Sequence, residues 1–201
     1  MPTEHQIIQQ CLVKSTLTGP ETQTSICLWL SRTLHLPGDI VECGCHRGNT
    51  TLVMMRFLKA VDCLKQVHVY DSFEGVPDID AKDGKTTLHK GSCAATVEEF
   101  RDNTKDFAPV VHPGWFSSTL PNQLPQCICF GFLDGDLYKS IEVSLVHVCP
   151  RLVQYGVVVV HDYARDWLPG VKTACDEYLA SHKNFASNRD NTGQLVIMRM
   201  H

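Results

Sequence analysis

The sequence lacks the features of a membrane protein or a nucleic-acid-binding protein. No run approaches the roughly 18 apolar residues that a membrane-spanning helix needs. The N-terminal stretch has neither the basic start nor the small-residue cleavage site of a secretory signal peptide. No cluster of lysine and arginine stands out, and the net charge is -4. We therefore expect a cytoplasmic protein with neither a membrane nor a nucleic acid as partner.

Internal repeats and low-complexity segments are also missing. A chain of 201 residues with 43% hydrophobic content suits one buried core, so we predict a single domain over 1–201. The ten cysteines mostly lie inside apolar runs, as free thiols do in reducing compartments. The C-x-C pairs at 43–45 and 127–129 have no second cluster at zinc spacing. Neither a disulfide framework nor a structural zinc ion is expected.

Five apolar runs recur at the spacing of βα units. They span 39–45, 66–72, 109–116, 127–136 and 156–163. Helical patterns lie between them and before them, at 21–35, 50–61, 97–105, 140–152 and 171–182. Four of the apolar runs are continuous, as in strands that are covered on both faces. This alternation predicts an α/β fold with a mostly parallel sheet and helices on both faces, after a helical N-terminal region, 1–36.

Two later segments break this alternation. The pair 185–189 and 194–200 is joined by Asn191-Thr192-Gly193, a turn signal, so we expect the last strands to run antiparallel. The stretch 73–96 has no periodicity and directly follows a strand end. A segment of this length without its own pattern is usually a lid or binding loop, so we predict that it covers a substrate.

The turn after the first strand carries an acid. A dinucleotide-binding turn offers G-x-G-x-x-G without one, because a pyrophosphate must lie against bare N–H groups. Here the glycines are Gly44 and Gly48, in the pattern G-x-x-x-G, and Glu42 comes two residues before them. A carboxylate attracts an amine and repels a phosphate. The turn therefore favours S-adenosylmethionine, which carries an ammonium and a sulfonium, over NAD, unless Glu42 simply ends a strand at the surface.

Polar residues also lie at the carboxyl ends of the other strands. In open α/β sheets, ligands bind at this edge. Asp71 ends the second strand and could accept both hydroxyls of an adenosine ribose, in NAD enzymes as well. Trp115 follows the third and is either a platform for an adenine ring or a core residue. Asp134 and Asp162 follow neighbouring strands. Two carboxylates that lie close together repel unless a cation lies between them, so we predict a divalent metal.

Several motifs together resemble one family. They are PGDIVECGCHRGNT, VYDSFEGVP, PGWFSSTLP, FLDGDLYKS and VVHDY. The chain resembles the macrocin O-methyltransferase (TylF-type) family of class I S-adenosylmethionine-dependent methyltransferases. The resemblance implies a Rossmann-like class I fold and magnesium-assisted methyl transfer to a sugar hydroxyl of a small molecule or glycan. By that similarity the donor would be held by Glu42, Gly44, Asp71 and Ser72, and the metal by Asp134 and Asp162.

One position departs from the family, which usually has two adjacent acids where this chain has His161 and Asp162. Imidazole suits softer metals better than it suits magnesium. Either His161 turns away from the metal, or the metal is softer, such as manganese, or His161 takes the proton. Candidate bases are His89, His161 and Asp136. The chain is shorter than typical family members, and the sequence leaves its oligomeric state open, a homo-oligomer included.

Three other functions remain open at this point. The acceptor could be catechol-like, although 73–96 offers little aromatic surface for a flat ring. The D-x-D pattern of Asp134 and Asp136 also occurs in glycosyltransferases that hold a nucleotide diphosphate, but Glu42 and Asp71 at the same edge would repel one. The third alternative is a non-catalytic S-adenosylmethionine binder in which His161 marks a decayed metal site.

Overall fold

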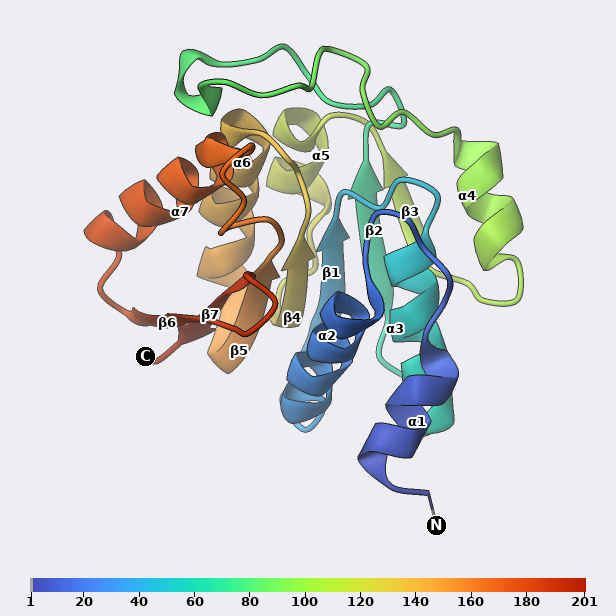
Figure 1. The fold of residues 1–201 in the computed structure, drawn as a ribbon. Helices are drawn as coiled ribbons and strands as arrows, with labels where there is room; N and C mark the ends of the chain where they lie inside the picture. The colour runs from blue at the N-terminus through green and yellow to red at the C-terminus, as the bar shows by residue number, and fades with distance from the viewer. Residues whose placement is uncertain (1) are drawn as a thin grey trace.

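A seven-stranded sheet runs through the middle of the computed structural model, which describes residues 2–201 (Figure 1). The strand order is β3-β2-β1-β4-β5-β7-β6. The strands are β1 (Asp39–Cys43), β2 (Val67–Asp71), β3 (Val110–Pro113), β4 (Ile128–Leu133), β5 (Leu152–Val160), β6 (Phe185–Arg189) and β7 (Leu195–Arg199). The first five strands pair in parallel, and β7 pairs antiparallel with β5 and with β6. The predicted mostly parallel sheet with an antiparallel C-terminal pair is confirmed.

Helices cover both faces of the sheet (Figure 1). The helices are α1 (Glu4–Cys11), α2 (Pro20–Thr33), α3 (Asn49–Ala60), α4 (Val97–Thr104), α5 (Phe116–Gln123), α6 (Tyr138–Val148) and α7 (Pro169–Ser181), with short 3-10 helices η1 (Ala81–Asp83) and η2 (Cys149–Arg151). Side chains of α1–α4 share one core cluster with the sheet, and those of α5–α7 share the other. Neighbouring residues of β1 divide between the two, since Ile40 joins the first and Val41 the second. This explains why the strands read as continuous apolar runs.

Across residues 2–201, the helices are all too short or too polar to span a bilayer.

Some element boundaries differ from the prediction, and proline is the common cause. The predicted helix 140–152 ends at Val148, because Pro150 interrupts it with η2, and β5 then begins at Leu152 instead of 156. The predicted strand 109–116 ends at Pro113, and the next residues begin α5. Pro121 lies inside α5, and because proline rarely occurs inside a helix, this segment was not predicted to be helical.

The turn after β1 lies very close to the end of β4. Gly44 has a φ of 88°, and a Cβ added to it would lie 1.9 Å from the carbonyl oxygen of Asp134. The backbone N–H of Asp134 donates to the carbonyl of Cys43 at 2.8 Å. Only glycine fits here, because the position requires both a left-handed conformation and the absence of a side chain. The contact brings the first turn against the acidic end of β4.

We expect Gly44→Ala to lower the free energy of unfolding by at least about 1–3 kcal/mol, because alanine adds backbone strain to the overlap with Asp134. Urea denaturation would measure the change. Gly19→Ala is the matched control, since Gly19 has a φ of -69° and its added Cβ would meet nothing closer than 3.4 Å. Equal stability of the two variants would contradict the prediction.

Candidate functional site

A cavity of about 630 Å³ opens at the carboxyl end of the sheet. Its wall comes from the turns after the five parallel strands, from loop 73–96 and from the connection between α1 and α2. The volume lies within the range of small-molecule binding sites. Most of the predicted site residues line this cavity, namely Gly44, Asp71, Ser72, Trp115, Asp134, Asp136, His161 and Asp162.

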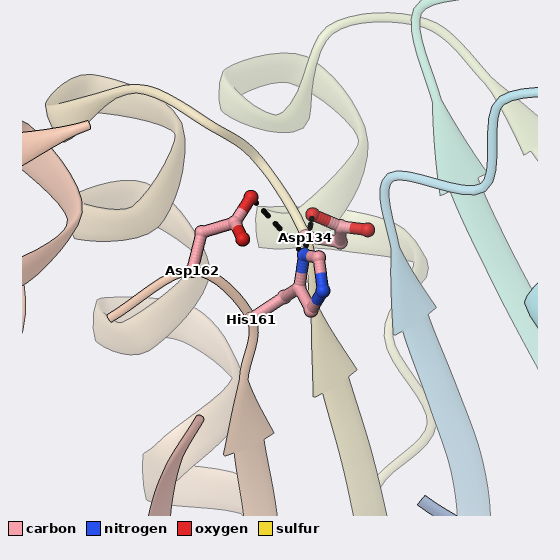
Figure 2. A group of neighbouring side chains, drawn as sticks. All are labelled: Asp134, His161 and Asp162. Carbon is pink, nitrogen blue, oxygen red and sulfur yellow. Dashed lines mark hydrogen bonds and ion pairs between the residues drawn. The ribbon is translucent and has the colours of Figure 1, made fainter. Parts of the chain in front are cut away.

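Three of these residues form a cluster at the ends of β4 and β5 (Figure 2). The Nδ1 atom of His161 lies 3.0 Å from Oδ1 of Asp134 and 3.2 Å from Oδ2 of Asp162. One ligand atom from each residue lies within 4.8 Å of the others, so the group could hold a metal ion. The ring of His161 points into the cluster in this structure.

The charged groups of the cluster change one another's pKa values. Burial alone would lower the pKa of His161, but the carboxylates of Asp134 and Asp162 outweigh burial and raise it well above its usual value. Burial would raise the pKa of Asp162, but His161 and Arg165 lower it. Burial raises the pKa of Asp136 to about 8, with repulsion from Asp134 and Asp162 adding to the effect. The ring nitrogen of His161 thus occupies the position between two carboxylates where we predicted a cation.

Asp71 organises the loops beside the cavity. Its Oδ2 accepts from the backbone N–H groups of Cys45 and His46 at 2.8 and 2.9 Å, and its Oδ1 accepts from that of Phe73 at 2.8 Å. A carboxylate offers about four lone-pair positions, so roughly one remains, on Oδ1. In this geometry Asp71 has room for about one further donor, such as a ribose hydroxyl.

Comparisons with known proteins add to this geometry. The model of the macrocin-O-methyltransferase (TylF) family matches residues 22–192. The chain belongs to the macrocin-O-methyltransferase family. The structure of the O-methyltransferase NovP superposes with a TM-score of 0.83 at 30% identity, covering 91% of this chain and 81% of that one.

Two curated relatives are similar to this TylF-family chain. Demethyldecarbamoylnovobiocin O-methyltransferase of Streptomyces niveus is 36% identical over 158 residues, which are 73% of this chain and 60% of the relative. The 8-demethyl-8-(2,3-dimethoxy-alpha-L-rhamnosyl)-tetracenomycin-C 4'-O-methyltransferase of Streptomyces olivaceus is 36% identical over 143 residues, which are 65% of this chain and 55% of the relative. The chain thus spans less than two thirds of the length of these relatives.

Glu42, which we predicted to hold the methyl donor, does not line the cavity in this structure. Its side chain is fully buried behind the cavity wall, where Oε2 accepts a hydrogen bond from the Thr51 hydroxyl of α3 and Oε1 has no partner within residues 2–201. Burial raises the pKa of Glu42 to about 8. Glu42 lies on the same face of β1 as Ile40, so its side chain points toward α3. Its charge therefore gives no direct argument for an amine in the cavity.

The predicted base His89 also lies off the cavity wall. Its side chain is exposed, and Nδ1 lies 3.1 Å from the Ser92 hydroxyl. The carbonyl of His89 also accepts from the N–H of Ser92 at 2.8 Å, so a tight turn holds the ring near this serine. Of the three predicted bases, Asp136 and His161 line the cavity and His89 does not.

Loop 73–96 crosses the carboxyl end of the sheet, with its two ends bonded to each other and its tip attached to α6 and α7 (Figure 1). At its base Val76 donates to the carbonyl of Ser92 at 2.9 Å and accepts from Gly91 at 3.0 Å. Near its tip the buried Asp83 accepts from the N–H of Tyr138, the first residue of α6, at 2.6 Å. The loop contributes Gly75, Val76, Pro77, Leu88 and Cys93 to the cavity wall.

Several wall residues escaped the sequence reasoning. His46, Asn49 and Thr50 come from the turn after β1, and the glycine spacing there was a usable signal for them. Arg165 and Trp167 follow β5, just beyond the polar strand end that was recognised. Residues 15–18 between α1 and α2 carried no signal, because their neighbours in space are far away in the sequence.

We expect Asp83→Ala to loosen the loop, because it removes the buried acceptor at the start of α6, at a cost of about 1–3 kcal/mol in stability. Hydrogen exchange should then speed up across 76–92. Asp78→Ala serves as the control, since the Asp78 side chain is 82% exposed and pairs with Lys90 on the same loop. Unchanged exchange across the loop in Asp83→Ala would refute its anchoring role.

Proposed function

We propose that this chain is an S-adenosylmethionine-dependent O-methyltransferase that acts on a hydroxyl of a sugar carried by a small molecule. The observation that carries the proposal is the acid-lined cavity at the carboxyl end of the sheet in a chain of the macrocin-O-methyltransferase family. The name of the relative from Streptomyces olivaceus specifies a rhamnosyl group, which supports a sugar acceptor. The family match favours methyl transfer over the glycosyltransferase alternative.

The residues on the wall fit the methyl donor. Gly44, Ser72 and Trp115 line the cavity together with Asp71, whose remaining lone pair can accept one ribose hydroxyl. When bound, S-adenosylmethionine supplies an electrophilic methyl group on a sulfonium. Transfer breaks the bond from carbon to sulfur, forms the bond from carbon to oxygen and releases one proton from the acceptor hydroxyl. The chain must therefore position the hydroxyl and receive that proton.

Asp136 is the best-placed proton acceptor. It lines the cavity directly after the Asp134 cluster, and its carboxylate has no hydrogen-bond partner within residues 2–201. His161 is less suitable, because its Nδ1 is already shared by two carboxylates. An acceptor hydroxyl held against Asp136 would donate its proton to Oδ1 or Oδ2 as the new bond forms.

We further propose that Asp134, His161 and Asp162 hold a divalent metal. Their two carboxylate oxygens and one ring nitrogen converge within the distances that a metal site needs. Such an ion supplies positive charge that orients a hydroxyl and lowers its pKa. Magnesium prefers oxygen ligands, whereas manganese and zinc accept an imidazole readily. This donor set therefore supports manganese or a softer metal over magnesium.

Asp136→Asn tests the reaction. We expect calorimetric titration to show that the variant binds S-adenosylhomocysteine as wild type does, and turnover on a glycoside acceptor to fall roughly 10²–10⁴-fold, because the amide cannot accept the proton. Asp166→Asn is the control, since Asp166 is exposed and lies off the cavity wall. Failure of the wild-type protein to bind S-adenosylhomocysteine would reject the methyltransferase assignment.

His161→Asp tests the metal. We expect wild type to bind Mn²⁺ roughly tenfold more tightly than Mg²⁺, and this ratio to shrink or reverse in the variant, because aspartate replaces the only nitrogen ligand by oxygen. Electron paramagnetic resonance of free Mn²⁺, with Mg²⁺ as competitor, measures both affinities without turnover. His89→Asp, on the exposed loop, is the control. If His161→Asp leaves the ratio of the two affinities unchanged, His161 does not ligate the metal.

A further inference from the structure

The connection between α1 and α2 reaches the cavity, although in the sequence it is remote from the strand ends that form most of the wall. In Figure 1 this connection, in dark blue, rises to the same end of the molecule as the strand ends. Ser15, Thr16, Leu17 and Thr18 all line the cavity wall. The family match begins only at residue 22, so it gives these residues no role. We call residues 13–18 the N-terminal strap.

One buried side chain holds both ends of the strap. The amide of Gln23, on the first turn of α2, is fully buried. Its Oε1 accepts from the N–H of Val13 at 2.9 Å, and its Nε2 donates to the carbonyls of Val13 and Thr18 at 3.0 and 2.9 Å. No other side chain in residues 2–201 bonds to both ends of this segment.

Apart from Gln23, the strap is held at its ends, where Val13 packs against the core and Thr18 is buried. Its internal hydrogen bonds run to the Ser15 hydroxyl, which accepts from the N–H groups of Leu17 and Thr18 at 3.2 Å each. Leu17 remains 56% exposed, so apolar burial holds the middle of the strap only weakly. An irregular segment without strand or helix partners depends on side chains to satisfy its backbone groups. Here Gln23 satisfies three of those groups.

We propose that Gln23 is a positioning residue that holds the N-terminal strap as a wall of the ligand cavity. The ligand meets a strap that is already ordered, so binding does not have to bear the entropy of ordering it. This proposal rests on the proposed function only for its ligand, because the donor is taken to be S-adenosylmethionine. Gln23 itself lies off the cavity wall and acts through the strap.

Gln23→Met tests the proposal, because methionine keeps the length of the side chain and removes all three hydrogen bonds. We expect amide exchange to accelerate across 13–18 and the affinity for S-adenosylhomocysteine to fall about tenfold. The KM for the donor should rise similarly while kcat at saturating donor stays within about twofold. Gln23→Glu should behave in the same way, since it keeps the acceptor for Val13 but loses both donors, and it serves if Gln23→Met does not fold.

Thr33→Val is the matched control. Thr33 is buried on the same helix, and its hydroxyl donates to the carbonyl of Leu30 at 2.9 Å, away from the strap. It should lower stability while leaving strap exchange and ligand affinity unchanged. Wild-type exchange and affinity in both Gln23 variants would overturn the proposal. If wild type itself does not bind S-adenosylhomocysteine, the proposed function fails, and strap exchange alone then decides the role of Gln23.

Discussion

Parallel pairing of β1, β4 and β5 is the constraint on which the site depends, because it brings three carboxyl strand ends together. The strands β4 and β5 lead into Asp134, Asp136 and Asp162, so negative charge is concentrated in a partly buried place. Like charges at such distances repel strongly. The fold relieves this by placing the Nδ1 of His161 between Asp134 and Asp162 and by leaving Asp136 with a raised pKa. The same concentration of charge makes the place suitable for a cation.

The acids near the cavity divide into two groups. Some hold the protein's own backbone or helices, as Asp71 does for the turn after β1 and Glu42 does for α3. Others face the cavity with their carboxylates largely available, as Asp134 and Asp136 do. A carboxylate that already accepts several N–H groups has little capacity left for a ligand. The carboxylates that remain free for a ligand therefore lie mainly at the strand ends of β4 and β5.

Two irregular segments complete the cavity, and both are held in the same way. Loop 73–96 is anchored by the buried Asp83, and the N-terminal strap is anchored by the buried Gln23. In each case one buried polar side chain bonds to backbone groups of a neighbouring segment, Tyr138 for Asp83 and Val13 and Thr18 for Gln23. Such a bond is costly to break, because a buried polar group without a partner loses its hydration. The cavity thus has walls that are ordered without belonging to a helix or strand.

The sequence by itself determined the sheet, its antiparallel end and the edge where the acids gather. Apolar continuity and turn residues are local signals, and parallel topology then places every strand end on one side. Only the tertiary structure decided that Glu42 faces α3, that His161 points into the cluster and that residues 15–18 reach the cavity. These features depend on contacts between segments that are distant in the sequence. A local sequence pattern does not specify which neighbouring element a side chain contacts.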